Sequence, residues 1–216
     1  KRIKIFFSEG IRQRAEVFVN RKLVGYELVH QTPFEIDVTD VVNYGSNNEL
    51  AVRITDPSGN FSWGDYTGDK WGDYLFPQSH GFGGILGAVE LRSVSPLYVS
   101  DVFVKNKPSL KDIDVDIEII NEASSKVLKG SVDVAIVEAW KSNAPVTDPK
   151  TLFAKNLGKV TVKTGETIKL TFSASVPKAR LWELRNSNLY NVVTTIKDSK
   201  GKVVDQHKQR FGFRFL

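Results

Sequence analysis

The sequence DVDIEI at residues 114–119 decides the fold class. Val115, Ile117 and Ile119 alternate there with acidic residues. Successive side chains of a β-strand point to opposite faces of a sheet, so this period of two predicts a half-buried strand. The same alternation recurs at residues 2–8, 14–19, 131–136 and 167–172. No helix of ordinary length is predicted before residue 96. The sequence therefore predicts an all-β fold.

Turn signals divide the strands into two sets. Pro96 lies between them, so we expect one domain over residues 1–96 and a second over 97–216. The second set has turn signals spaced as in an antiparallel sandwich. This spacing predicts an immunoglobulin-like β-sandwich held by packing alone. Its turns are expected at 122–126, 143–149, 163–166 and 198–201.

Charge differs between the two halves. The net charge of +5 divides into −2 for residues 1–96 and +7 for residues 97–216. This difference favours two separate units. Most of the positive charge is lysine that alternates with apolar residues along strands, which is typical of a solvated sheet face. We therefore expect no nucleic-acid partner.

Composition excludes several kinds of chemistry. The chain has no cysteine, which rules out disulfides and thiolate sites, and no methionine, which suggests a piece of a longer chain. No apolar run approaches the 18 residues that a membrane helix needs, so no membrane span is expected. His30, His80 and His207 are scattered without metal-ligand spacing. The sequence predicts no metal site and no cofactor.

A long segment, PSGNFSWGDYTGDKWGDYLFPQSHGFGGILG at residues 57–87, fits neither a core nor a short turn. Seven of the chain's 23 aromatic residues lie between Phe61 and Phe82, interleaved with glycines. Disordered segments are poor in aromatics, so we expect an ordered surface. Trp-Gly-Asp-Tyr occurs twice, at 63–66 and 71–74.

Flat rings beside carboxylates suit a pyranose, which has an apolar C–H face and a rim of hydroxyls. This predicts a carbohydrate-binding surface formed by Trp63, Asp65, Trp71, Asp73 and His80. Three other interpretations stay open. The segment could fold its aromatics into a core of its own, its two repeats could be similar hairpin arms by chance, and its aspartates could bind calcium, although their spacing differs from an EF-hand. For His80, a turn cap is an alternative to a sugar-hydroxyl donor.

Several stretches together resemble glycoside hydrolase family 2, the family of β-galactosidases, β-glucuronidases and β-mannosidases. They span nearly the whole chain in the family's order. Arg21 in place of a hairpin glycine and Gly87 in place of a frequent arginine are departures. The prolines of the Trp-Tyr segment are also missing. The stretches that carry the resemblance are 15–25, TPFEIDVT at 32–39, NELAVR at 48–53, GGI at 83–85 with VEL at 89–91, LW at 181–182, LY at 189–190, Asp205 and RFGFR at 210–214.

The resemblance implies a sugar-binding jelly-roll (galactose-binding-like) β-sandwich followed by the immunoglobulin-like one. It also implies that the Gly-Phe-Arg end leads into a catalytic (β/α)₈ barrel, which is not among these residues. A retaining glycosidase needs two carboxyl groups about 5–5.5 Å apart. Glu90, Glu118 and Glu138 fall on outward strand positions and suggest no such pair. No catalytic residue is predicted.

The expected function is that of a non-catalytic N-terminal portion of a retaining exo-β-glycosidase. Its partners would be a β-glycoside and the barrel of the parent chain. Two alternatives stay open: an independent carbohydrate-binding module and a purely structural spacer. The resemblance also implies that the first domain lacks its initial strands. An open sheet edge would then favour association into homo-oligomers.

Overall fold

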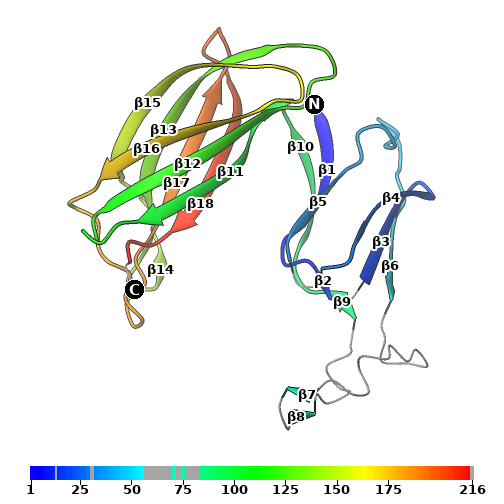
Figure 1. The fold of residues 1–216 in the computed structure, drawn as a ribbon, viewed down its shortest axis with the longest axis horizontal. Coiled ribbons are helices and arrows are strands. Elements are labelled where there is room, and N and C mark those ends of the chain that lie inside the picture. Colours follow the sequence, from blue (N-terminus) through cyan, green and yellow to red (C-terminus); the bar gives the residue numbers. More distant parts are fainter. Residues whose placement is uncertain (13, 30–31, 56–69, 72–73, 76–82, 215–216) are drawn as a thin grey trace. The chain divides into compact units, whose positions relative to one another are not determined.

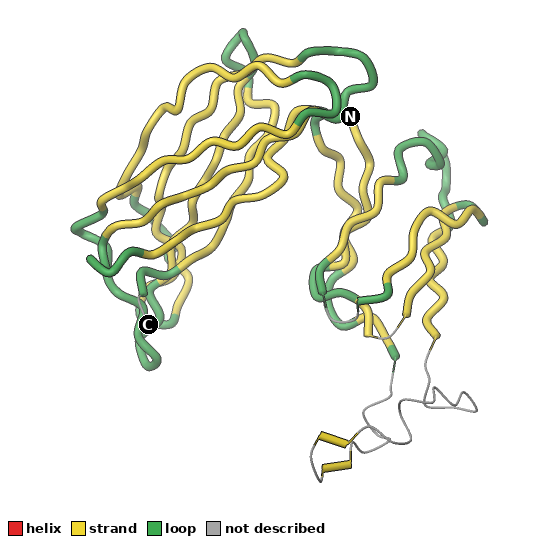
Figure 2. The backbone as a smooth tube through the Cα atoms, viewed as in Figure 1, coloured by secondary structure: helices red, strands yellow, loops and turns green. Residues whose placement is uncertain are grey.

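The computed structural model describes all residues except 13, 30–31, 56–69, 72–73, 76–82 and 215–216. The described residues form antiparallel sheets and no helix, as predicted (Figure 2). The chain divides into two compact units, Lys1–Val94 and Ser95–Leu216, called unit 1 and unit 2 below. Each unit is a β-sandwich with its own apolar core.

Unit 1 contains two three-stranded sheets, coloured blue to green in Figure 1. The first has the strand order β10-β1-β5 and the second has the order β4-β3-β6. Two short strands, β2 and β9, pair separately. The strands are β1 (Arg2–Phe7), β2 (Ile11–Arg12), β3 (Arg14–Val19), β4 (Lys22–Glu27), β5 (Phe34–Asp37), β6 (Leu50–Thr55), β9 (Gly84–Ile85) and β10 (Val89–Val94).

The core of unit 1 follows from the alternation in β1 and β3. Ile5 and Phe7 point inward from β1, and Val17 meets them from β3. Phe7 is fully buried and stacks on Phe34 of β5 with ring centroids 4.6 Å apart. Because the side chains between these positions point outward, each sheet presents one apolar face to the other.

Two connections in unit 1 depend on special backbone geometry. Asn20 and Arg21 both adopt positive φ, 51° and 66°, as a two-residue hairpin between β3 and β4 requires. Positive φ is unfavourable for arginine, and the tight turn forms although Arg21 occupies this position. The residues between β9 and β10 are not part of a strand, and a Cβ at Gly87 among them would lie 2.6 Å from Ser8 Oγ. Ser8 and Ala88 instead exchange hydrogen bonds of 3.0 and 2.9 Å.

Unit 2 contains a three-stranded sheet, β11-β12-β16, and a five-stranded sheet, in which β13 pairs with β14, β15 and β17, and β17 pairs with β18. β11 and β18 belong to different sheets and lie in contact. The strands are β11 (Leu97–Asn106), β12 (Asp112–Asn121), β13 (Leu128–Lys141), β14 (Ala144–Pro145), β15 (Thr151–Val162), β16 (Thr167–Ser175), β17 (Leu189–Lys197) and β18 (Val203–Phe211).

The core of unit 2 is built from the alternating strands predicted at the start. Val115, Ile117 and Ile119 are fully buried on β12. At one end of the core Phe213 is also fully buried, with its ring edge-on to Tyr190 at 5.2 Å and to Phe211 at 5.0 Å. The core therefore extends beyond the last strand into the residues that follow it.

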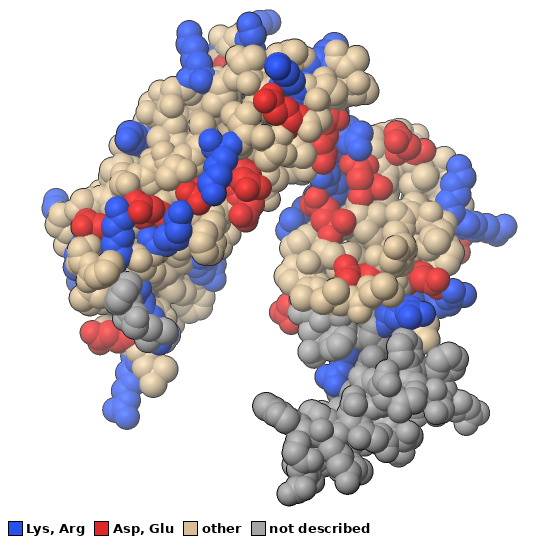
Figure 3. Space-filling view, viewed as in Figure 1, with Lys and Arg blue, Asp and Glu red and all other residues tan. Residues whose placement is uncertain are grey.

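The outer face of the β11-β12-β16 sheet carries a charged ladder. Asp116 accepts hydrogen bonds from Lys105 at 2.8 Å and from Thr171 at 3.0 Å, and it pairs with Lys169 at 2.7 Å. Figure 3 shows basic and acidic side chains next to one another across the visible face of this unit. The hydrogen bonds from Lys105 and Lys169 hold the pKa of the Asp116 carboxyl far below its usual range.

We expect Asp116→Asn to lower the urea midpoint of unit 2 at pH 7. The folded-state pKa of this carboxyl is lowered below its unfolded value, so its stabilisation is fully present above about pH 4 and is lost as pH falls through the folded pKa. The difference from the wild type should therefore shrink as the pH falls below about 4. Asp148→Asn, on an exposed turn, is the matched control. A pH-independent difference would contradict this assignment.

Candidate functional site

Four of the five predicted sugar-binding residues, Trp63, Asp65, Asp73 and His80, lie outside the described residues. Trp71 belongs to the short strand β7 (Lys70–Trp71), which pairs with β8 (Tyr74–Leu75). Trp71 is opposite Tyr74 in this register, so the ends of the second Trp-Gly-Asp-Tyr repeat pair with one another through the backbone. The sugar-binding role of these residues stays a prediction.

The segment that carries these residues connects β6 with β9. It follows Thr55, at the end of β6, and leads into Gly84 of β9, which is opposite Arg12 of β2. β6 pairs with β3 in the second sheet, and β2 and β9 form a separate pair. Both ends of the segment are therefore attached to ordered strands of unit 1.

Several carboxylates in the described part of the chain are engaged in structural contacts. On unit 1, Glu35 pairs with Lys4 at 2.9 Å, and Glu90 pairs with Arg92 at 2.9 Å. Asp37 accepts hydrogen bonds from Thr39 and Arg2, which lower the pKa of its carboxyl although burial opposes them. On unit 2, Glu138 accepts a hydrogen bond from the backbone of Lys150.

The described residues contain neither a metal-binding cluster nor a membrane-spanning helix. No group of three or more histidine or acidic side chains there could hold a metal ion. No helix in this part of the chain is long and apolar enough to cross a membrane.

Unit 1 has an apolar groove between its two sheets. Leu91 of β10 is opposite the buried Ile5, and Leu50 of β6 is opposite the buried Val19, so both face the core side. Leu91 is nevertheless 73% exposed and Leu50 is 45% exposed. The groove has a volume of about 240 Å³ and also includes Val89. The association into homo-oligomers that the sequence analysis expects stays a prediction.

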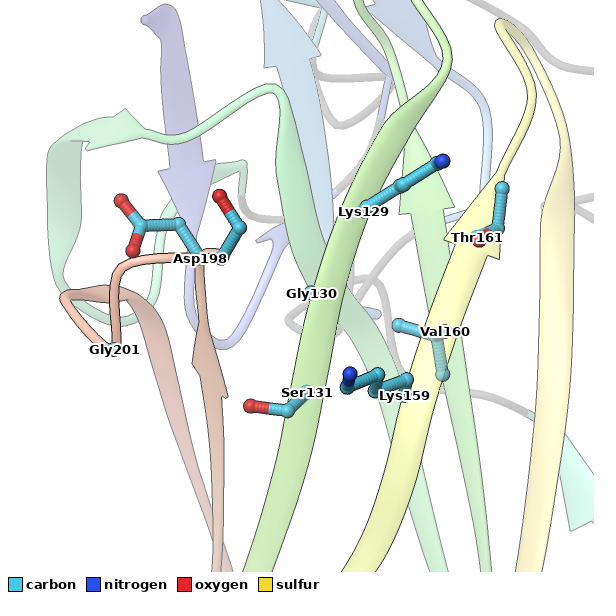
Figure 4. A pocket seen from close by; sticks show the side chains of 9 residues that line it. Lys129, Gly130, Ser131, Lys159, Val160, Thr161, Asp198 and Gly201 are labelled. Atoms are coloured by element: carbon cyan, nitrogen blue, oxygen red, sulfur yellow. The ribbon is translucent and has the colours of Figure 1, made fainter.

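Unit 2 has a larger hollow of about 570 Å³, called the β13 concavity below. This volume lies in the range of about 300–1,000 Å³ that is usual for small-molecule sites. Figure 4 shows the Asp198–Gly201 turn on one side of β13 and β15 on the other. The residues that line it are Lys129, Gly130, Ser131, Lys159, Val160, Thr161, Asp198, Ser199 and Gly201.

The four polar side chains that β13 and β15 contribute to the β13 concavity share one face of the sheet. Lys129 is opposite Thr161 in the register, and Ser131 is opposite Lys159. Directly opposite residues point to the same face, and diagonal neighbours are about 7–8 Å apart. Lys129 and Lys159 are diagonal neighbours, so their flexible side chains can reach one ligand group between them.

The nearby carboxylates already have local partners. Asp133 pairs with Lys197 at 2.8 Å and accepts a hydrogen bond from Asn156 at 2.7 Å, and these two contacts hold the pKa of its carboxyl below the usual range. Asp198 accepts the backbone N–H groups of Lys200 and Lys202, both at 2.9 Å. Lys129 and Lys159 are exposed, and neither forms an ion pair with a carboxylate of the described residues.

The last described residues form a second polar and aromatic cluster. The guanidinium of Arg214 lies 4.4 Å from the ring centroid of Trp182. Trp182 also donates its backbone N–H to Phe213 at 2.9 Å, and a Cβ at Gly212 would lie 3.0 Å from the Cβ of Trp182. Leu184, in the adjoining loop, is 87% exposed.

Comparison with known proteins identifies the family. Residues 97–214 match the family described as glycosyl hydrolases family 2, which is more than half of the 216 residues. The chain belongs to glycosyl hydrolase family 2. The resemblance seen in the sequence motifs and the predicted all-β sandwich class are both confirmed.

Similar family 2 proteins match nearly the whole chain. A β-glucuronidase of Formosa agariphila is 26% identical over 98% of this chain and 22% of its own length. A β-galactosidase of Clostridium acetobutylicum is 26% identical over 95% of this chain and 20% of its own length. A family 2 member from Bacteroides cellulosilyticus has a similar structure, with a TM-score of 0.74 and 25% identity over 99% of this chain and 26% of its own.

The chain thus corresponds to a portion of larger family 2 enzymes. It spans about a fifth to a quarter of the length of these relatives. The sequence motifs located this family accurately, but they did not indicate the β13 concavity. Its lysines and hydroxyls come from separate strands and a turn, and no local spacing signals that they meet.

Proposed function

We propose that this chain is the non-catalytic N-terminal portion of a retaining exo-β-glycosidase. The observation that carries the proposal is the family 2 match over residues 97–214. Relatives named β-glucuronidase and β-galactosidase support a β-glycoside as the substrate of the parent protein. Such an enzyme needs an acid/base and a nucleophile carboxylate about 5–5.5 Å apart. We assign both to the catalytic barrel of the parent chain.

A supporting role for the barrel is part of this proposal. The cluster around Trp182 and Arg214 directly adjoins the buried Phe213, so its geometry is fixed by the core of unit 2. The exposed Leu184 beside it offers apolar surface to a neighbouring domain. We assign this end of unit 2 as the surface against which the barrel packs.

The second part of the proposal is that this chain contributes residues to the sugar pocket of the parent enzyme. We assign stacking to Trp63 and Trp71, hydroxyl acceptance to Asp65 and Asp73, and hydroxyl donation to His80. The attachment of their segment to β6 and β9 supports this assignment, because ordered strands can hold an extended loop in place.

The test compares this chain with the parent protein that includes the barrel. Aryl β-glucuronides and aryl β-galactosides are offered to both at equal concentration. We expect hydrolysis with retention of anomeric configuration by the parent and only the buffer rate with residues 1–216. Turnover by residues 1–216 that a glutamate substitution abolishes would overturn the non-catalytic assignment. If the parent protein hydrolyses no β-glycoside, the assignment of the parent as a glycosidase is overturned.

A further inference from the structure

The β13 concavity combines features of a ligand site that the proposed function leaves unused. It has the volume of a small-molecule site, and the buried Gly130 and Val160 are among the residues that line it. Three hydroxyl groups, on Ser131, Thr161 and Ser199, line its sides. Hydroxyls of this kind can both donate to and accept from a polar ligand.

Charge selects among the ligands. Lys129 and Lys159 are diagonal neighbours on one face, while Asp133 and Asp198 are bound to other partners. The lining therefore has two lysines and one carboxylate, Asp198, which is bound by backbone N–H groups. An anionic group between the two ammonium groups would be held by charge-assisted hydrogen bonds.

The lining also lacks an aromatic ring. A neutral pyranose depends largely on stacking against a flat ring for its affinity, so it would find few contacts here. A single-stranded nucleic acid also uses aromatic platforms, together with a basic groove that follows its backbone. The concavity offers a compact hollow with hydroxyls instead, which favours a small ligand that carries both hydroxyl groups and a negative charge.

We propose that the β13 concavity of unit 2 is a secondary binding site for an anionic saccharide, one that bears a sulfate ester or a uronate carboxylate. Lys129 and Lys159 bind the anionic group, and Ser131, Thr161 and Ser199 bind sugar hydroxyls. This inference rests on the proposed function only for the assignment of the ligand as a saccharide. The site would attach the enzyme to an acidic polysaccharide at a point away from the reacting bond.

The test measures saccharide binding to the chain by isothermal titration calorimetry at low ionic strength. The probes are a sulfated disaccharide, glucuronic acid, glucose, inorganic sulfate and a single-stranded oligonucleotide. We expect the acidic saccharides to bind, with affinity that falls as salt is added, and glucose not to bind. Lys129→Gln and Lys159→Gln should each weaken binding about threefold to tenfold. Lys208→Gln, an exposed lysine on β18 of the same sheet, is the matched control and should change nothing.

Three results would overturn the site. Equal binding of glucose and glucuronic acid would remove the role of charge. Equal weakening by Lys208→Gln would show a diffuse surface effect, and inorganic sulfate or an oligonucleotide that binds more tightly than every saccharide would assign the lysines to another ligand. Hydrolysis of a small aryl glycoside by the parent enzyme should be unchanged in both variants. A failure of the glycosidase assignment is thus distinguishable from a failure of this site.

Discussion

Replacing Phe213 with alanine is expected to lower the free energy of unfolding of unit 2 by about 3–5 kcal/mol. The ring is fully buried and makes edge contacts with Tyr190 and Phe211. Alanine would leave a cavity at the end of the core, where the backbone of residue 213 also pairs with Leu181. Urea-dependent amide exchange, measured on peptides from β13 and β17, would give the change for this unit alone.

Phe103→Ala is the matched control for this substitution. Phe103 lies on β11 of the same unit but is 58% exposed. We expect its loss to change stability by less than about 0.5–1 kcal/mol, because little buried area is removed. If both variants unfold at the same urea concentration, the residues after β18 are not part of the core of unit 2.

Residue alternation predicted the strands because each sheet has one buried face. β12 shows this directly: Ile117 and Ile119 are fully buried, whereas Asp116 and Glu118, which alternate with them, point to the charged outer face. The period of two is a local property, so a single sequence contains it. The pairing partners are not local, and alternation alone did not predict that β13 would pair with β14, β15 and β17.

Contacts between residues far apart in the chain could not be predicted from local sequence patterns. Between β9 and β10, Ala88 exchanges hydrogen bonds with Ser8, which is 80 positions away in the chain. Asp205 gives a similar example. Its carboxylate accepts the backbone N–H of Val99, 106 positions away, at 2.9 Å, and burial raises its pKa. The motif identified Asp205 as a family position, but only the structure shows that it ties β18 to a bulge in β11.

The segment at 57–87 could be identified from the sequence, whereas the β13 concavity could not. The segment at 57–87 is marked by its composition, since seven aromatics and repeated glycines in one stretch are unusual. The β13 concavity has no such mark. Lys129, Lys159 and Asp198 are ordinary residues of lysine-rich strands and a turn, and only the register of β13 with β15 places the two lysines together.

The largest functional effect is expected in the parent enzyme from Asp65→Ala or Asp73→Ala. If each carboxylate accepts a hydrogen bond from a substrate hydroxyl, its removal should cost about 1.5–3 kcal/mol, which corresponds to a decrease of about 10- to 150-fold in kcat/KM. Steady-state kinetics on an aryl glycoside would measure this change. Asp40→Ala, an exposed aspartate elsewhere in unit 1, is the control and should keep the wild-type value.

The kinetic pattern of these variants separates a sugar-binding role from a structural one. A lost contact to the substrate lowers kcat/KM and leaves the unfolding of unit 1 unchanged, because the carboxylate is then not part of its core. A segment that only packs its own aromatics would instead lose stability when Trp63 or Trp71 is replaced, with normal kinetics in both aspartate variants. That second pattern would show that the segment is a structural element, and the five residues would no longer be assigned to the sugar pocket.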